Sequence, residues 1–229
     1  MKTLFVTGTD TGVGKTLISK ALIDYFVSQG ELVAPMKPVA SGAFIQHDKL
    51  VNDDALILID AANARFDYAT VNPYVFEEPI APHIAAARNE VEIDIQQLNR
   101  THQKLVQGAD RIIVEGAGGW QVPLTTEVSM ADWVSKNRWP VVLVIGLRLG
   151  CINHARLTYL DLLAKQSHLA GWVINKIDPD VLVTEEVIED LKGYIKAPLL
   201  GVVPWLASEA KQAQAPDVAQ YLDFSLLGL

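Results

Sequence analysis

The stretch Gly8-Thr9-Asp10-Thr11-Gly12-Val13-Gly14-Lys15-Thr16 decides the fold of this 229-residue chain. An apolar run at residues 4–6 precedes it and an amphipathic stretch at 17–29 follows it, so it joins a predicted strand to a predicted helix. Glycines let the backbone curl until amide N–H groups and the helix N-terminus face a polyphosphate. In such a loop the lysine reaches the β- and γ-phosphates and the next hydroxyl reaches Mg²⁺. The stretch therefore predicts a phosphate-binding loop, with Lys15 and Thr16 in those roles.

Length, charge and composition narrow the class of protein further. The chain fits one α/β domain over residues 1–229. No apolar run approaches the roughly 18 residues of a spanning helix, and a net charge of −8 argues against a nucleic-acid partner. The single cysteine, Cys151, cannot form an internal disulfide, and the first strand begins too early for a cleavable signal peptide. We therefore expect a cytoplasmic protein without a membrane partner.

Short β-rich runs alternate with helical patterns along the chain. The strands are predicted at residues 2–7, 32–37, 111–115, 141–145, 171–175 and 199–203. The helices are predicted at residues 16–28, 53–62, 94–107, 130–136, 153–167, 185–194 and 216–226, with a surface loop at 207–216. Near-continuous apolar strands separated by helices are typical of a mainly parallel sheet with helices on both faces. With the phosphate loop, this indicates an α/β fold of the P-loop nucleoside triphosphatase type.

Polar residues follow several of the predicted strands. Ligands of parallel sheets collect beyond the carboxyl ends of the strands, and Lys37 ends the second strand, where we expect it to face the phosphate crevice. Glu115 closes the apolar run 112–114 like the acidic residue of a Walker-B strand, which places an oxygen near Mg²⁺. Asp53 is the predicted cap of the next helix. Asp54 then remains as a candidate metal ligand.

The segment Asn175-Lys176-Ile177-Asp178 follows the fifth predicted strand. It matches the Asn-Lys-x-Asp pattern by which many GTPases recognise guanine. Pro179 also makes Asp178 a natural turn residue. The pattern alone therefore leaves the choice between ATP and GTP open.

With these residues assembled, the chain resembles the dethiobiotin synthetases, which carboxylate and cyclise a diamine in biotin synthesis. The resemblance runs nearly end to end, although family members often carry glutamate in place of Gly12. The motifs that carry it are the loop at 8–16, Lys37-Pro38-Val39-Ala40-Ser41-Gly42, Asn52-Asp53-Asp54-Ala55, Asn72-Pro73-Tyr74, Ala81-Pro82-His83, Val114-Glu115-Gly116-Ala117-Gly118-Gly119-Trp120, Leu149-Gly150-Cys151-Ile152-Asn153-His154-Ala155 and Pro198-Leu199-Leu200-Gly201.

The resemblance implies a ligase that converts 7,8-diaminopelargonic acid, CO₂ and ATP into dethiobiotin, ADP and phosphate, through a carbamate and a carbamic-phosphoric anhydride. It implies a Mg²⁺ ion held by Thr16, Asp54 and Glu115, and catalytic roles for Lys15, Lys37 and Thr11. The implied nucleotide-binding residues are Gly12, Val13, Gly14, Lys15, Thr16, Leu17, Asp54, Glu115, Gly116, Ala117, Gly118, Asn175, Lys176, Pro204, Trp205 and Leu206. The implied substrate-binding residues are Thr11, Lys37, Ser41, Gly150, Cys151, Ile152 and Asn153, the last four supplied by the second subunit of a homodimer.

Two other classes of protein fit the phosphate loop. A nucleotide-driven switch like the partition ATPases carries an additional lysine near the start of the loop, where this chain has Gly8-Thr9-Asp10. An amide-forming ligase related to the cobyrinic acid synthases usually adds a glutamine-hydrolysing domain, for which 229 residues leave no room. Both rank below the synthetase. Cys151 is expected to be a small packing residue rather than a nucleophile, and Trp120 and Trp133 are expected in the core or an interface.

Overall fold

A computed structural model describes residues 2–206 and 217–228 of the chain. Its centre is a six-stranded parallel sheet in the order β10-β9-β8-β1-β7-β2. The strands are β1 (Thr3–Gly8), β2 (Val33–Met36), β7 (Arg111–Glu115), β8 (Val141–Leu147), β9 (Leu169–Lys176) and β10 (Leu199–Val203). All six predicted strands are confirmed, and their ends differ from the prediction by at most two residues.

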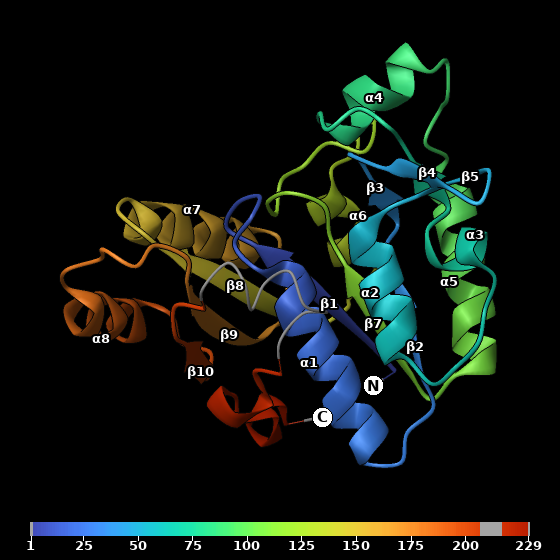
Figure 1. The fold of residues 1–229 in the computed structure, drawn as a ribbon. Coiled ribbons are helices and arrows are strands. Elements are labelled where there is room, and N and C mark those ends of the chain that lie inside the picture. The colour runs from blue at the N-terminus through green and yellow to red at the C-terminus, as the bar shows by residue number, and fades with distance from the viewer. Residues whose placement is uncertain (1, 207–216, 229) are drawn as a thin grey trace.

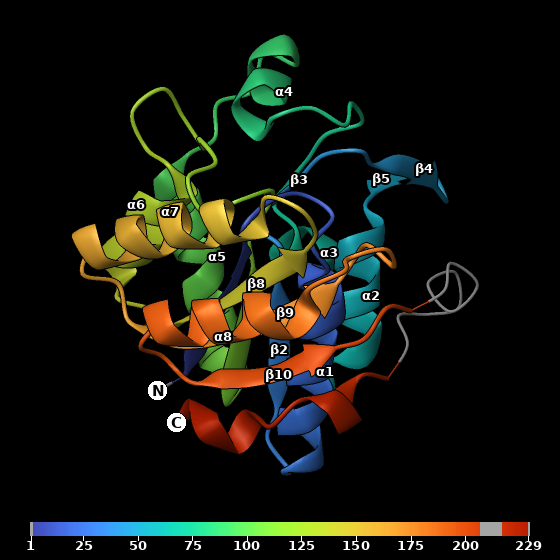
Figure 2. The ribbon, with the colours of Figure 1, turned by 90° about the vertical axis from the view of Figure 1, so that its left-hand side faces the viewer.

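Helices cover both faces of this sheet (Figures 1 and 2). On one face, a single apolar cluster packs α1 (Lys15–Ser28), α2 (Asp53–Ala61) and the C-terminal segment 217–228. On the other face, a second cluster packs α5 (Ile95–Gly108), α6 (Met130–Asn137), α7 (Cys151–Ala164) and α8 (Thr184–Tyr194). Every residue of the central strands β1 and β8 is consequently buried, which explains their uninterrupted apolar sequences. Among the described residues, no helix is long and apolar enough to cross a membrane.

Several short elements stand above the carboxyl edge of the sheet, where α4 is the outermost in both views (Figures 1 and 2). They are the parallel pair β3 (Val39–Ala40) and β6 (Tyr74–Val75), the hairpin of β4 (Phe44–Gln46) and β5 (Lys49–Val51), and the helix α4 (Pro82–Arg88). Another short helix, α3 (Tyr68–Val71), lies at the side of the sheet against α5 and β2 (Figure 1). The sequence pattern did not predict them, because elements of two to seven residues are too short to show a period.

The predicted helix at residues 216–226 is wrong. The described part of this region instead contains two short 3₁₀ turns, Ala219–Tyr221 and Phe224–Leu227. Between them, Leu222 forms an antiparallel bridge with Gly201, and the Asp223 carboxylate accepts a hydrogen bond from Ser225 N at 3.0 Å. These contacts draw the backbone out of a helical path. The surface loop predicted at 207–216 lies outside the described residues.

The start of α7 and the cap of α2 differ from the prediction. α7 starts at Cys151, two residues early, because Gly150 adopts a φ of +91° and turns the chain directly into the helix. Asn52, not Asp53, caps α2, since Asn52 Oδ1 accepts from Ala55 N at 3.4 Å. Asp53 is exposed in the first turn, where its negative charge suits the helix dipole.

α5 carries a buried histidine at the amino end of the sheet, opposite the phosphate loop. His102 Nε2 lies 2.9 Å from Thr3 Oγ1, and the imidazole ring packs against Trp139 with ring centroids 4.4 Å apart. Burial lowers the pKa of His102 to about 4. The ring is therefore neutral in the folded protein at pH 7.

We expect the free energy of unfolding to depend on pH through His102. Between pH 6.5 and about 4 the unfolded chain binds a proton that the folded chain does not, so stability falls as the pH is lowered through this window. The complete loss is roughly 3 kcal/mol. Urea unfolding from pH 8 to 4 should show a shallower fall for His102→Gln than for wild type, whereas the exposed His168 gives a control in His168→Gln that follows wild type. Equal falls in all three proteins would contradict this assignment.

Candidate functional site

A cavity of about 790 Å³ opens at the carboxyl edge of the sheet, beyond β1, β2, β7 and β9. It is lined by fourteen of the predicted site residues: Thr11, Gly12, Gly14, Lys15, Thr16, Leu17, Lys37, Ser41, Asp54, Ala117, Gly118, Asn175, Lys176 and Leu206. The remaining predicted residues lie outside this lining in the described chain, namely Val13, Glu115, Gly116, Pro204, Trp205 and the segment 150–153. Residues far apart in the sequence thus meet around one cavity.

The phosphate loop approaches its neighbours so closely that glycine is required at position 14. Gly14 is the N-cap of α1 with a φ of +95°, a conformation that side chains rarely adopt. A Cβ atom there would also lie 2.2 Å from Asn175 Nδ2. Asn175 holds this position because its Nδ2 donates to the carbonyl of Val13 at 2.9 Å. The N-terminus of α1, whose first N–H groups have no helical acceptor, opens on the cavity.

Three contacts of Asp10 hold the loop in shape. Lys15 is buried, and its Nζ donates to the carbonyl of Asp10 at 2.9 Å. Burial and the nearby charge of Lys37 lower the pKa of Lys15 to about 8. The Asp10 carboxylate accepts from Thr11 N at 2.7 Å and forms an ion pair with Arg148, which follows β8. The loop is therefore tied to the β8–α7 connection.

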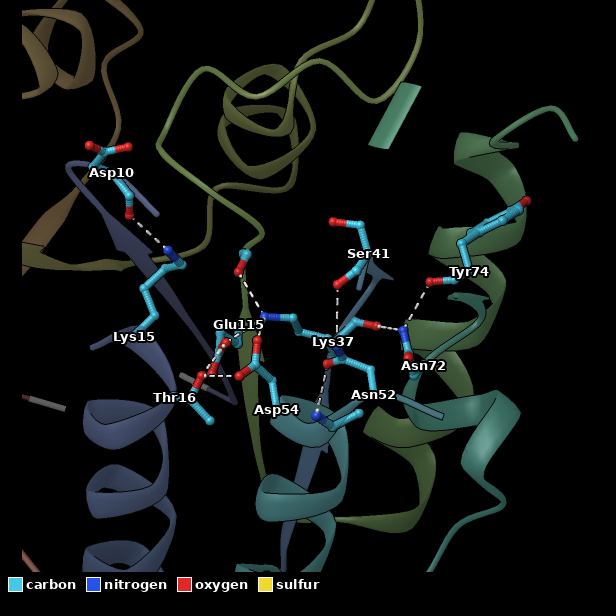
Figure 3. A network of polar contacts seen from close by, with 12 residues as sticks. Asp10, Lys15, Thr16, Lys37, Ser41, Asn52, Asp54, Asn72, Tyr74 and Glu115 are labelled. Atoms are coloured by element: carbon cyan, nitrogen blue, oxygen red, sulfur yellow. Dashed lines mark hydrogen bonds and ion pairs between the residues drawn. The ribbon is translucent and has the colours of Figure 1, made fainter. Parts of the chain in front are cut away.

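Lys37 follows the last residue of β2 and Glu115 is the last residue of β7, and their side chains lie next to each other. Met36 pairs with Val114 in the register of β2 and β7, so the next residue of each strand projects at the same level. Lys37 Nζ lies 2.5 Å from Glu115 Oε1 and 2.8 Å from Asp54 Oδ2, and Figure 3 shows the ammonium group between these carboxylates. Burial acts to lower the pKa of Lys37, but the two negative charges outweigh it and the pKa stands above its usual value. Lys37 therefore stays charged.

The residues implied as metal ligands come together. The Thr16 hydroxyl donates to Asp54 Oδ1 at 2.8 Å and to Glu115 Oε1 at 3.0 Å (Figure 3). Glu115 Oε2 is buried and has no hydrogen-bond partner among the described residues. Hydroxyl and carboxylate oxygens are the ligands that Mg²⁺ prefers, and in nucleotide sites phosphates and water complete its shell. The donor set therefore fits a Mg²⁺ ion that binds together with a nucleotide.

Three polar residues that support this site could not be found from motif spacing. Asn72, Tyr68 and Asn52 form hydrogen bonds that reach the main chain of Lys37 and the start of α2. Asn72 belongs to a motif of the family resemblance, but its role depends on tertiary contacts that spacing does not reveal. The segment 79–82 before and within α4 also lines the cavity. Cys151, Trp120 and Trp133 are buried, which confirms their predicted packing role.

Comparisons with known proteins identify the family of the chain. A family model described as an AAA domain matches residues 2–213. The ATP-dependent dethiobiotin synthetase BioD 1 of Escherichia coli (strain K12) is 44% identical over 226 residues, which cover 99% of both chains. The synthetase BioD of Aeromonas salmonicida (strain A449) is 42% identical over 207 residues, which cover 90% of this chain and 92% of that protein.

Solved structures of P-loop ATPases share the fold. The septum site-determining protein MinD of Pyrococcus horikoshii, complexed with Mg-ADP, aligns with a TM-score of 0.60 and 16% identity, covering 99% of this chain and 93% of that one. A ParA family ATPase from Chlorobium tepidum aligns with a TM-score of 0.56 and 16% identity, covering 99% and 96%. These likenesses confirm the predicted fold class, whereas the identity to the synthetases extends over the whole sequence. The chain belongs to the family of ATP-dependent dethiobiotin synthetases.

Proposed function

We propose that this chain catalyses the ATP-dependent carboxylation and ring closure of 7,8-diaminopelargonic acid to dethiobiotin. One observation carries the proposal beyond family membership: a buried, charged lysine stands beside a phosphate loop and two carboxylates, on the wall of a cavity large enough for nucleotide and diamine together. The Lys37 ammonium is suited to a reaction that brings a carbamate against a triphosphate, because two anions must be neutralised where they meet.

The proposed reaction has three bond-forming steps. One amine of the substrate attacks CO₂ and loses a proton, which gives a carbamate. A carbamate oxygen then attacks the γ-phosphorus of ATP, and ADP leaves. The second amine attacks the carbamoyl carbon, loses a proton and expels phosphate as the ring closes. Each step depends mainly on holding the reacting groups in line and on neutralising charge.

The residues around the cavity suit these steps. Lys15 and the N-terminus of α1 would hold the β- and γ-phosphates. Mg²⁺, held by Thr16, Asp54 and Glu115, would neutralise and orient the triphosphate when bound. The hydroxyl groups of Thr11 and Ser41 line the same cavity and can orient a neutral amine without adding charge.

The alternatives explain less of the chain. The fold is compatible with a nucleotide-driven switch of the partition ATPase type, but structures at 16% identity show no more than the fold. The amide ligase reading has no observation in its favour. We place the reaction in the cytoplasm, where the single cysteine would remain reduced.

Pure protein incubated with the diamine, labelled bicarbonate and MgATP should yield labelled dethiobiotin.

The variant Lys37→Leu should lower kcat in the same assay by about 10²-fold or more, because it removes a charge that stabilises the transferring phosphoryl group. Because the substitution leaves Glu115 without its nearest cation, the variant should also melt at a lower temperature. Its activity should therefore be measured well below that temperature. Lys165→Leu is a matched control, since it removes an ion pair of 2.7 Å to Asp132 away from the cavity. Wild type without labelled product would refute the proposed function, and normal turnover in Lys37→Leu would remove that residue from the mechanism.

The surroundings of the base favour ATP over GTP. Asn175, Lys176 and Ile177 line the cavity, but Asp178 is not part of the lining. Its Oδ1 accepts a hydrogen bond from Asp180 N at 2.9 Å, which closes a turn around Pro179. Asp178 therefore has the structural role of a turn residue rather than that of a guanine-binding carboxylate.

We accordingly expect a higher kcat/KM for ATP than for GTP. Asp178→Ala should change the kcat/KM for ATP by less than about twofold. Initial rates of dethiobiotin formation with each nucleotide test both statements. Asp180→Ala is the matched control, since it removes a neighbouring carboxylate but keeps the main-chain N–H that donates to Asp178. A preference for GTP that disappears in Asp178→Ala would overturn the assignment.

The outer face of α7 supports the homodimer. Leu157, Leu160 and Leu163 form an exposed apolar stripe at helical spacing, and Leu149 just before the helix is 98% exposed. The opposite face of α7 packs on the sheet through Ala155, Tyr159 and Leu162. We propose that a second copy of the chain covers the stripe and that segment 150–153 of each copy contributes to the substrate site of the other.

Leu160→Asp should therefore convert a dimer into a monomer in light-scattering measurements. It should weaken the diamine more than MgATP, because the nucleotide residues belong to one copy. Leu226→Asp is a suitable control, since Leu226 is exposed to a similar extent, 47% against 50%, but lies on the C-terminal turn. A wild-type monomer with full activity would exclude the shared site.

A further inference from the structure

Asn72 connects the end of β2 with β6. Its Nδ2 donates to the carbonyl of Lys37 at 2.7 Å and to the carbonyl of Tyr74 at 3.0 Å. The residue is 2% exposed, and Figure 3 shows its amide group turned toward both main-chain segments. The main chain of Lys37 is thus anchored on the side away from the phosphate loop.

Tyr68 extends this connection to α2. Its hydroxyl donates to Asn72 Oδ1 at 2.8 Å and accepts from Asn52 N at 2.8 Å. Asn52 is the N-cap of α2, whose first turn carries Asp54. One hydroxyl therefore joins the anchor of Lys37 to the helix that presents its carboxylate partner. Burial raises the pKa of Tyr68, so the hydroxyl keeps its proton and remains a donor.

We propose that Tyr68 is a positioning residue of the reaction, which fixes Lys37 relative to Asp54 through Asn72 and Asn52. The inference rests on the proposed function, because it concerns the geometry of that reaction. Without the hydroxyl, Asn72 Oδ1 and Asn52 N lose their partner, and the two ends of the connection can move independently. Displacements near 1 Å at reacting groups cost large factors in rate. The loss should appear in kcat, since no atom of Tyr68 lines the cavity.

Tyr74 provides a matched control within the same chain. Its hydroxyl donates to Gln97 Oε1 at 3.0 Å and accepts from Asp94 N at 2.9 Å, and Asp94 is the N-cap of α5. Each tyrosine thus joins a side-chain amide oxygen to a helix cap. Among the described residues, α5 contributes nothing to the cavity lining. Tyr74→Phe therefore removes two hydroxyl hydrogen bonds of the same kind away from the cavity, and it leaves in place the Tyr74 main-chain carbonyl that accepts from Asn72.

The test compares Tyr68→Phe with Tyr74→Phe by melting temperature, kcat, and KM for MgATP and the diamine. Both variants should melt at similarly reduced temperatures. Only Tyr68→Phe should lose about tenfold in kcat, with KM for MgATP within twofold of wild type. In the Lys37→Leu background the further loss on Tyr68→Phe should shrink below twofold, because the group that it positions is gone.

Equal losses of kcat in the two tyrosine variants would overturn the positioning role, as would a full tenfold loss in the Lys37→Leu background. Asn72→Asp tests the same connection if Tyr68→Phe does not fold, since the carboxylate still accepts from Tyr68 but cannot donate to the carbonyl of Lys37. A folded Asn72→Asp variant with wild-type kcat would also overturn the proposal. A wild-type enzyme that forms no dethiobiotin would refute the proposed function instead.

Discussion

The buried ion pair between Lys37 and Glu115 is the interaction on which the rest of this site depends. Glu115 is 0% exposed and Lys37 is 2% exposed, so neither charge is tolerable without the other. The register of the neighbouring parallel strands β2 and β7 places the Lys37 ammonium and the Glu115 carboxylate next to each other, and α2 adds the Asp54 carboxylate. The order of strands in the sheet is therefore also a condition for the electrostatics of the cavity.

Two ammonium groups and two carboxylates form the charged cluster at the phosphate loop, namely Lys15, Lys37, Asp54 and Glu115. The two lysines differ in how closely they are paired with the carboxylates. Lys37 has both carboxylates as direct partners, whereas within the described chain Lys15 donates to the Asp10 carbonyl, and burial together with the charge of Lys37 lowers its pKa to about 8. The positive charge of Lys15 is therefore not neutralised by a direct ion pair with a described residue.

The sequence predicted much of this arrangement for physical reasons that can be named. Buried parallel strands are continuous apolar runs, so all six were found, and the residues after them were the natural candidates for the site. The hydrogen bonds of Tyr68, Asn72 and Asn52 were not found, because they join segments through tertiary contacts without a period or a fixed spacing. The C-terminal helix was predicted wrongly because a bridge to Gly201 overrides local propensity. The single domain and the ligand roles of individual residues stay predictions.

The close approach of Gly14 to Asn175 links the two ends of the nucleotide site. The Asn175 amide fills the space that a side chain at position 14 would need, and it also holds the carbonyl of Val13. Alanine at position 14 would be strained by the φ of +95° even with a smaller residue at 175, so we expect glycine at position 14 in homologues whatever residue 175 is. A substitution at Asn175 would for the same reason release the carbonyl of Val13 and change the shape of the phosphate loop, whatever else residue 175 contacts.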